Sequence, residues 1–295
     1  AKVLLLCFLE LCSAEGIPPF EDFNAMILVL LLKKKYEVLS CGLTAAKLLD
    51  LRPISISNFF KRLMVSAVRI CMAPAFKLYL HPDQRLLYSM SESIAEVSAE
   101  LGVLRDKEIS GGVLQLDFEN AFPSVGHEFM DSLLSHISMM PWFVWFNKNS
   151  HRRVYHTFRR GQVAEICCWI MRGVMQGDAM AMYMFCLVMD VAVIAIHTKM
   201  RWGERAWAWA DDLTIKLLSM TRISTMLEVI FDFKPVANLA LNAPKSVWAY
   251  ALAPDDRDQR CWDAWALARG WSSLVVSSHT VQLGVEVGLV TPDIV

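Results

Sequence analysis

Residues 207–215 read WAWADDLTI, and the adjacent acids Asp211 and Asp212 separate an aromatic and small-residue run from an apolar run. Flanks of this kind predict two short strands, with the acids at the turn of a hairpin. Adjacent carboxylates repel each other, and a divalent cation offsets that repulsion because hard cations bind carboxylate oxygens. Taken alone, the pair is more commonly a solvated turn. Its meaning therefore depends on partners elsewhere in the chain.

Length and composition indicate that the chain buries a substantial core. It has 295 residues, of which 55% are hydrophobic, and a mean hydropathy of +0.36, which suits one large domain or two subdomains. The sequence predicts no membrane span, because no apolar run reaches the roughly 18 residues that a membrane helix needs. Residues 3–9 are similar to the apolar part of a signal peptide, but the run is marginal and we expect a buried helix there.

Charge and cysteine content bear on the partners and the compartment. The net charge of −1 does not favour a nucleic-acid binder. However, residues 151–160 alternate Arg and His with Tyr155 and Phe158, a pattern that can follow a phosphate backbone and stack bases; a solvated hairpin explains it equally well. The eight cysteines show no metal-ligand spacing, so we expect reduced thiols in an intracellular protein.

Apolar periodicity predicts a mixture of helices and strands. Helices are expected over residues 1–35, 57–79, 91–101, 127–137, 180–198 and 221–233. Strands are expected over residues 113–118, 246–252 and 281–287, with a hairpin over 152–170 that turns at Gly161 and a charged loop over 255–260. Helices and strands do not alternate strictly, which favours an α+β fold.

A second carboxylate gives the acidic pair a partner. Asp117 ends the apolar run of residues 113–116, so two strands side by side would bring Asp117 and Asp211 together. Carboxylates paired in this way hold two divalent ions roughly 3.5–4 Å apart. Such a pair of ions activates an attacking hydroxyl and stabilises a leaving pyrophosphate, which is the main requirement of phosphoryl transfer.

Segments spread over residues 20–288 resemble, in order, the motifs of reverse transcriptases of retrotransposons that lack long terminal repeats. They are ILVLLLKK at 27–34, LRPIS at 51–55, HPDQ at 81–84, LDFENAFPSV at 116–125, GVMQGD at 173–178, WADD at 209–212, LALNAPK at 239–245 and QLGV at 282–285. The resemblance implies an α+β palm-and-fingers polymerase with a small antiparallel palm sheet flanked by helices. It implies an N-terminal fingers region at 1–110, a palm at 111–288 with an inserted finger hairpin at about 151–172, and a truncated end at 289–295 with the thumb largely absent.

The resemblance also implies roles for the matching residues. The expected metal ligands are Asp117, Asp211, Asp212 and the backbone carbonyl of Phe118, and Lys245 is the expected general acid near the pyrophosphate. The expected nucleotide contacts are Phe118, Asn120, Ala121, Phe122, Gln176, Gly177, Arg52 and Lys33 or its neighbour Lys34. Phe122 aligns with the aromatic gate that excludes a 2′-hydroxyl, although core packing also explains it. Surface positions explain Lys245 and Arg52 equally well.

The implied activity is RNA-directed DNA polymerisation, a nucleotidyl transfer. The implied partners are an RNA template, a DNA primer and deoxynucleoside triphosphates, and no membrane is implied. The implied cofactors are two Mg²⁺ ions, which Mn²⁺ can replace. The implied compartment is the nucleus or the cytoplasm. A catalytically decayed remnant that at most binds RNA is one alternative, favoured by Ala179 and Ala181 where the family has Pro and Ser. An RNA-dependent RNA polymerase is another, and Phe122 argues against it.

Overall fold

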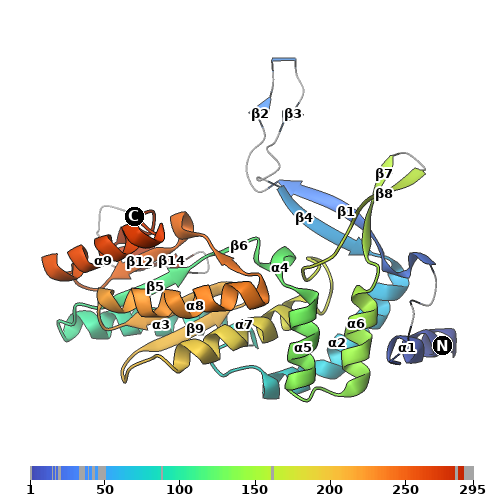
Figure 1. Ribbon diagram of the computed structural model, residues 1–295, viewed down its shortest axis with the longest axis horizontal. Helices are drawn as coiled ribbons and strands as arrows, with labels where there is room; N and C mark the ends of the chain where they lie inside the picture. The colour runs from blue at the N-terminus through green and yellow to red at the C-terminus, as the bar shows by residue number, and fades with distance from the viewer. Residues whose placement is uncertain are drawn as a thin grey trace. The chain divides into compact units, whose positions relative to one another are not determined.

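The chain forms two compact units, each built from two segments. Unit 1 comprises Ala1–Ala75 and Val125–Met184, and unit 2 comprises Phe76–Ser124 and Phe185–Val295. The computed structural model describes residues 2–14, 16, 18, 21–32, 37–38, 40–41, 44–45, 51–87, 89–160, 163–282 and 285–288. Helices and small sheets are mixed in both units (Figure 1), which confirms the expected α+β class.

Unit 1 contains a four-stranded sheet of order β4-β1-β7-β8. Strand β1 (Ala25–Leu32) pairs antiparallel with β4 (Leu51–Ser57) and parallel with β7 (Tyr155–Arg160), which in turn pairs antiparallel with β8 (Val163–Trp169). Pro53 lies in β4, at the edge of the sheet, where the missing N–H of proline is tolerated. The expected hairpin over 152–170 is confirmed as β7–β8, although Gly161 lies outside the described residues.

Helices and shorter elements complete unit 1. They are α1 (Lys2–Leu11), a 3-10 helix (Glu21–Asn24), β2 (Glu37–Val38), β3 (Thr44–Ala45), α5 (His127–His136) and α6 (Pro141–His151). Two further helices, α2 (Phe59–Tyr79) and α7 (Ala181–His197), each contain a boundary between the units. The expected helices over 57–79, 127–137 and 180–198 are therefore confirmed, whereas α6 was not predicted.

The expectation of a helix throughout residues 1–35 is wrong at β1. An eight-residue apolar run fits a buried strand and a buried helix equally well by pattern alone. The neighbouring strands β4 and β7 decide the outcome, because they satisfy the backbone of β1 on both sides. Helix α1 does form, but it is not buried: Leu11 is its buried residue, and the Val3 side chain is 72% exposed.

Unit 2 is organised around a five-stranded sheet of order β13-β12-β5-β10-β9. All neighbouring pairs are antiparallel except β12–β13. The strands are β5 (Gly112–Leu116), β9 (Arg205–Trp209), β10 (Asp212–Leu217), β12 (Val247–Tyr250) and β13 (Val275–Ser277). Strands β5 and β10 are buried except at Gln115 and Asp212, as expected for strands covered on both faces.

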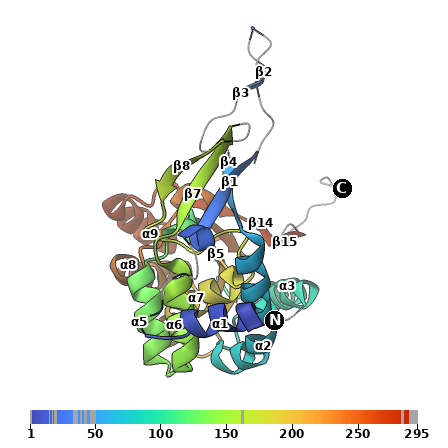
Figure 2. The ribbon, with the colours of Figure 1, turned by 90° about the vertical axis from the view of Figure 1, so that its right-hand side faces the viewer.

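Helices cover both faces of this sheet. Figure 2 shows α3 (Met90–Asp106) on one side and α8 (Ile223–Ala237) with α9 (Asp256–Arg269) on the other. On the α3 side, Val97, Leu101 and Leu104 form a buried cluster with Val113 of β5 and Trp207 of β9. The sheet is therefore held from both sides, which keeps its strand ends in a defined place.

Short elements connect the strands of unit 2. They are the 3-10 helices Arg85–Leu87, Met220–Arg222 and Ala243–Lys245, helix α4 (Ala121–Ser124), and strands β6 (Phe118–Glu119), β11 (Ala240–Leu241), β14 (His279–Gln282) and β15 (Val285–Gly288). The final element expected over 281–287 is thus a hairpin, β14–β15, and not a single strand.

The expected charged loop over residues 255–260 is also wrong, because α9 starts there. Asp255 Oδ1 accepts a hydrogen bond of 2.7 Å from the N–H of Asp258 and caps the helix. Asp256 and Asp258 lie in the first turn, where negative charge favours the helix dipole. A run of charged residues therefore marks a helix start here.

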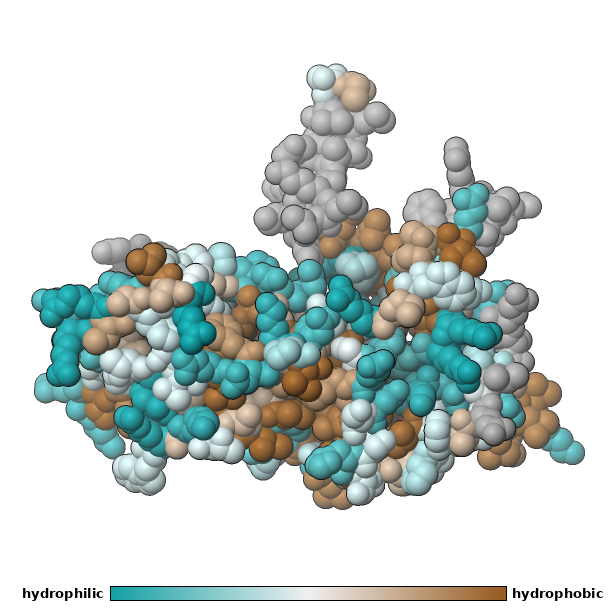
Figure 3. Space-filling view, in the orientation of Figure 1, coloured by the Kyte–Doolittle hydropathy of each residue, from teal (hydrophilic) through white to brown (hydrophobic). Residues whose placement is uncertain are grey.

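Apolar side chains are exposed on the four-stranded sheet of unit 1 (Figure 3). They are Ile27, Leu30, Leu31, Ile56, Ile166 and Trp169, which are between 38% and 57% exposed. Across the part of the chain that the structure describes, no helix has both the length and the apolar character of a membrane span.

Candidate active site

The two sequence segments that carry the acids meet at one end of the unit 2 sheet. Strands β5 and β10 pair antiparallel up to Leu116 and Leu213. Asp117 follows Leu116 and Asp212 precedes Leu213, so extending the antiparallel register places the two acids opposite each other. The register of this central pair is set by apolar residues on both strands, which makes the closeness of the acids a consequence of the core.

Asp211 occupies the turn of the β9–β10 hairpin. Trp209 pairs with Asp212, which leaves Ala210 and Asp211 as a two-residue loop. Ala210 has a φ of 54°, in the left-handed region that tight hairpin turns require at their first loop position. This turn places Asp211 next to Asp212 at the sheet end where Asp117 also lies.

The three carboxyl groups lie close enough to affect one another's charge. Burial raises the pKa of Asp212 to about 6, and the neighbouring charges of Asp211 and Asp117 add to the shift. The Oδ2 atom of Asp117 is buried and accepts no hydrogen bond. Three acids and a buried carboxylate oxygen without a donor fit divalent cations, which bind oxygen ligands and neutralise the charge.

Lys245, the expected general acid, lies close to this group of carboxylates in the structure. Its Nζ lies 3.8 Å from Oδ2 of Asp117, and its side chain is 68% exposed. Its segment is tied to the same acid: the N–H of Asn242 donates to the Asp117 carbonyl at 2.8 Å, and the Asp117 N–H donates to Ser246 Oγ at 3.2 Å. The lysine side chain is therefore exposed to solvent, whereas the backbone of its segment is anchored to Asp117.

The residues that follow Asp117 form a short turn into α4. Phe118 is buried and pairs with Leu241. Asn120 has a φ of 45°, a left-handed conformation that asparagine tolerates better than most residues. Ala121 is buried at the start of α4.

Phe122 lies half-buried in the same turn. Its ring stacks on Phe185 of α7, with the ring centroids 4.4 Å apart and the planes 18° apart. Stacking of this kind limits the orientations that the ring can adopt.

A cleft of about 350 Å³ opens beside the acids. Asp117, Asp212 and Lys245 line it together with residues of β5, β12, β13 and β14. Unit 2 thus brings four of the expected catalytic side chains to one place and leaves an open volume next to them.

The other expected nucleotide contacts belong to unit 1. The N–H of Ser55 in β4 donates to the Gln176 carbonyl at 2.8 Å. Gly177 has a φ of 107°, and a Cβ there would lie 2.6 Å from the Ser55 carbonyl oxygen, so only glycine fits. Arg52, also on β4, is exposed. Lys33 lies outside the described residues.

Buried polar groups follow the turn at Gln176 and Gly177. Asp178 Oδ1 accepts a 2.8 Å hydrogen bond from the N–H of Met180 and so caps the start of α7. Burial raises the pKa of Asp178, and the buried ammonium of Lys61 opposes that shift. The helix behind the turn therefore has a cap, although Ala179 and Ala181 stand where the resembled family has Pro and Ser.

Comparison with known proteins identifies the family. A family model described as "Reverse transcriptase (RNA-dependent DNA polymerase)" matches residues 34–286. The chain belongs to the reverse transcriptase family. The expectation drawn from the sequence motifs is therefore confirmed, and divalent metal ions are in general use among reverse transcriptase domains.

One relative of this reverse transcriptase domain is a retrotransposon protein. A retrovirus-related Pol polyprotein from the type-1 retrotransposable element R2 of Popillia japonica is 27% identical over 212 residues, which cover 66% of this chain and 29% of that protein. The chain thus spans under a third of that relative, whose name agrees with the expected retrotransposon type.

Among solved structures, two yeast telomerases share the fold. A telomerase from Candida tropicalis in complex with a fragment of telomeric RNA has a TM-score of 0.58 and 10% identity, covering 78% of this chain and 41% of that one. One from Candida albicans has a TM-score of 0.56 and 10% identity, covering 78% and 42%. At such identities the likeness shows the polymerase fold alone, and it confirms the expected palm-type architecture.

One residue of this reverse transcriptase domain had no predicted role and turns out to support the acidic turn. Gln84 is 1% exposed, and its Oε1 accepts a 3.2 Å hydrogen bond from the N–H of Ala210. Next to it, the N–H of Ala208 donates to the Asp83 carbonyl at 2.8 Å. Residues 81–84 match a family motif in the sequence, but nothing in the spacing shows that they contact a hairpin 126 residues away.

Proposed function

We propose that this reverse transcriptase domain adds deoxynucleotides to the 3′-hydroxyl of a DNA primer on an RNA template. The observation that carries the proposal is the meeting of Asp117, Asp211 and Asp212 at one end of the β5–β10 pair, beside an open cleft. In this assignment residues 111–288 supply the palm, apart from the inserted hairpin β7–β8, which belongs to the fingers together with β4.

Asp117, Asp211 and Asp212, with the Phe118 carbonyl, would hold two Mg²⁺ ions. Once bound, such ions supply the charge that activates a primer hydroxyl and stabilises a leaving pyrophosphate. The three carboxylates would present their oxygen atoms to the ions from the end of the sheet. Their crowding favours cation binding over protonation at neutral pH. The chain itself contributes mainly position and charge, as phosphoryl transfer requires.

Other residues have narrower proposed roles. The Lys245 ammonium, exposed and 3.8 Å from Asp117 Oδ2, reaches into the cleft and can donate a proton to the pyrophosphate. Phe122, held by its stack on Phe185, would meet the sugar edge of the nucleotide and disfavour a 2′-hydroxyl. The remaining proposed contacts to nucleotide or template are Asn120, Ala121, Gln176, Gly177, Arg52 and Lys33.

Primer extension on an RNA template tests the proposal. The wild-type chain should incorporate deoxynucleotides in a Mg²⁺-dependent manner, and Asp211→Asn should lower the rate by at least about a hundredfold, because it removes a charge from the ion-binding group. Asp256→Asn, an exposed acid in the first turn of α9, is the matched control and should keep the wild-type rate.

Each other outcome has a definite meaning. Equal incorporation by the wild type and Asp211→Asn would remove Asp211 from the catalytic group. RNA binding that weakens with salt, without any Mg²⁺-dependent incorporation, would identify a binding remnant in place of an enzyme. A preference for ribonucleotides in the same assay would identify an RNA polymerase.

A further inference from the structure

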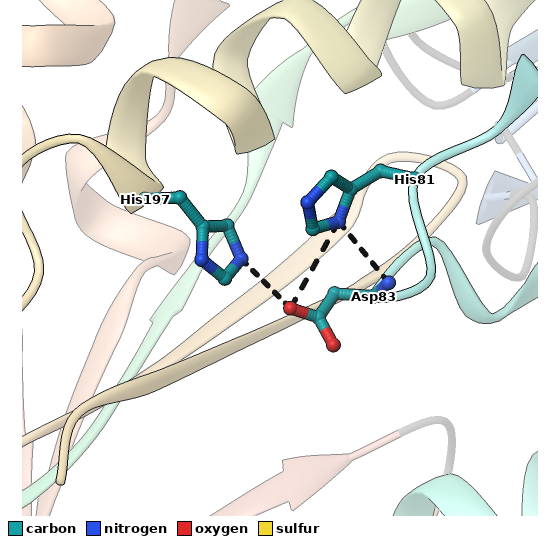
Figure 4. A group of neighbouring side chains, drawn as sticks. All are labelled: His81, Asp83 and His197. Atoms are coloured by element: carbon teal, nitrogen blue, oxygen red, sulfur yellow. Dashed lines mark hydrogen bonds and ion pairs between the residues drawn. The ribbon is translucent and has the colours of Figure 1, made fainter.

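A second group of side chains of the types that can bind a metal ion lies in unit 2, apart from the three acids at the hairpin turn (Figure 4). His81 and Asp83 come from the segment before the 3-10 helix Arg85–Leu87, and His197 ends α7. Each residue offers one ligand atom, and these atoms all lie within 4.8 Å of one another. Two imidazoles and one carboxylate thus converge from distant parts of the chain.

Distances between the three ligand atoms suit coordination of one shared metal ion. Asp83 Oδ2 lies 2.7 Å from His197 Nε2 and 3.9 Å from His81 Nδ1. Metal–ligand bonds of about 2.0–2.1 Å at tetrahedral angles separate ligand atoms by about 3.3 Å. The two observed distances lie on either side of that value, so side-chain shifts of less than about 1 Å would complete the geometry.

The hydrogen bond that His81 Nδ1 accepts shows which ring nitrogen carries a lone pair. The N–H of Asp83 donates to His81 Nδ1 at 3.2 Å, which means that this nitrogen is unprotonated. The hydrogen bond is at the long end of the normal range, so a metal ion can replace it. Unprotonated imidazole nitrogen is the form that binds metals.

Charge and access also favour a cation. The Asp83 side chain is 15% exposed, and the basic side chains within 4 Å of its carboxylate, among the described residues, are the two histidines. The centroids of the two histidine rings lie 4.6 Å apart. A largely buried carboxylate without a lysine or arginine partner gains from a bound cation. The histidine side chains are 24% and 33% exposed, which leaves an entry path and room for a water ligand.

We propose that His81, Asp83 and His197 bind one divalent transition-metal ion of the zinc type. Two nitrogens and one oxygen favour Zn²⁺ or Co²⁺ over Mg²⁺, which prefers oxygen ligands alone. The bound ion would connect the end of α7 to the segment whose Gln84 holds the Ala210 turn. This site does not depend on polymerase activity, and its ligand chemistry differs from that of the catalytic acids.

Titration calorimetry with Zn²⁺ on the full chain tests the site, with Co²⁺ absorption as a second readout. The wild type should bind one equivalent, and so should Asp117→Asn/Asp211→Asn, in which the carboxylate group is disabled. His197→Gln keeps a side-chain N–H donor for Asp83 but lacks the imidazole. It should lower the Zn²⁺ affinity by more than about tenfold and remove the visible Co²⁺ bands.

Controls separate metal binding from a purely hydrogen-bonded cluster. His279→Gln alters an exposed histidine paired with Glu286 and should leave Zn²⁺ binding unchanged. Asp83→Asn is the second variant if thermal unfolding shows that His197→Gln does not fold. The proposal is overturned if the wild type binds no stoichiometric Zn²⁺, or if His197→Gln and Asp83→Asn both bind it as tightly as the wild type.

Discussion

Gln84 is a buried side chain outside the acidic group that contacts the turn carrying Asp211. Its Oε1 is the acceptor for the Ala210 N–H. Gln84→Met keeps the size of the side chain and removes that acceptor, so the N–H would be buried without a partner. We expect the free energy of unfolding to fall by about 1–3 kcal/mol. Primer extension should also slow, because the turn that carries Asp211 loosens.

Gln259→Met is the matched control for that substitution. The Gln259 side chain bonds Asp263 one turn further along α9, at the surface, and surface substitutions usually change stability by less than about 0.5 kcal/mol. Urea denaturation of both variants measures the difference. Equal stabilities for Gln84→Met and Gln259→Met would show that the turn holds its conformation without Gln84.

At the scale of elements, β5 depends on a glycine at its first position. A Cβ at Gly112 would lie 2.4 Å from the Ala249 carbonyl oxygen of β12, which is backbone and cannot move aside. Gly112→Ala should therefore push β5 and β12 apart and lower the free energy of unfolding by about 1–3 kcal/mol. Since β5 leads into Asp117, Mg²⁺-dependent incorporation should fall with it.

Gly102, in the same unit, is a glycine where substitution by alanine should stabilise the protein. It lies inside α3, where an added Cβ meets nothing within 4 Å. Alanine there should raise the free energy of unfolding by about 0.5–1 kcal/mol, because glycine disfavours a helix interior. Thermal and urea unfolding of Gly102→Ala and Gly112→Ala should give shifts of opposite sign. Shifts of the same sign would contradict this account of β5.

At the scale of the whole molecule, Lys61 makes stability depend on pH. The side chain is 1% exposed, and its Nζ donates to Asn24 Oδ1 at 2.8 Å and to the Ser150 carbonyl at 2.7 Å. Burial lowers its pKa from 10.5 to about 8, against the opposing effect of Asp178. Between those values the unfolded chain keeps a proton that the folded chain has lost.

Stability from this group therefore rises as pH increases from about 8 to 10.5. The full rise would be up to about 3 kcal/mol. Urea unfolding across this range should show a smaller slope for Lys61→Met and for Lys61→Arg, since neither side chain titrates there. Lys107→Met, an exposed position after α3, should keep the wild-type slope. An unchanged slope in both Lys61 variants would rule out this linkage.

Local patterns were sufficient for much of the fold and for the family. The apolar run before Asp117, the acids at 211–212 and the motifs around them are short local stretches of sequence. Their order in the chain is sufficient to indicate a reverse transcriptase. Strands β5, β9 and β10 and helices α2, α3 and α7 followed from periodicity, because side-chain spacing reports directly on the buried face.

Tertiary structure alone decided the features that depend on distant partners. Residues 25–32 form a strand because β4 and β7 bond to them, and the local pattern allowed either a strand or a helix. Gln84 reaches Ala210, and Asp83 reaches His197, across more than a hundred positions. Propensity and spacing act over a few residues, whereas these hydrogen bonds and ligand groups exist only once the chain has brought their atoms together.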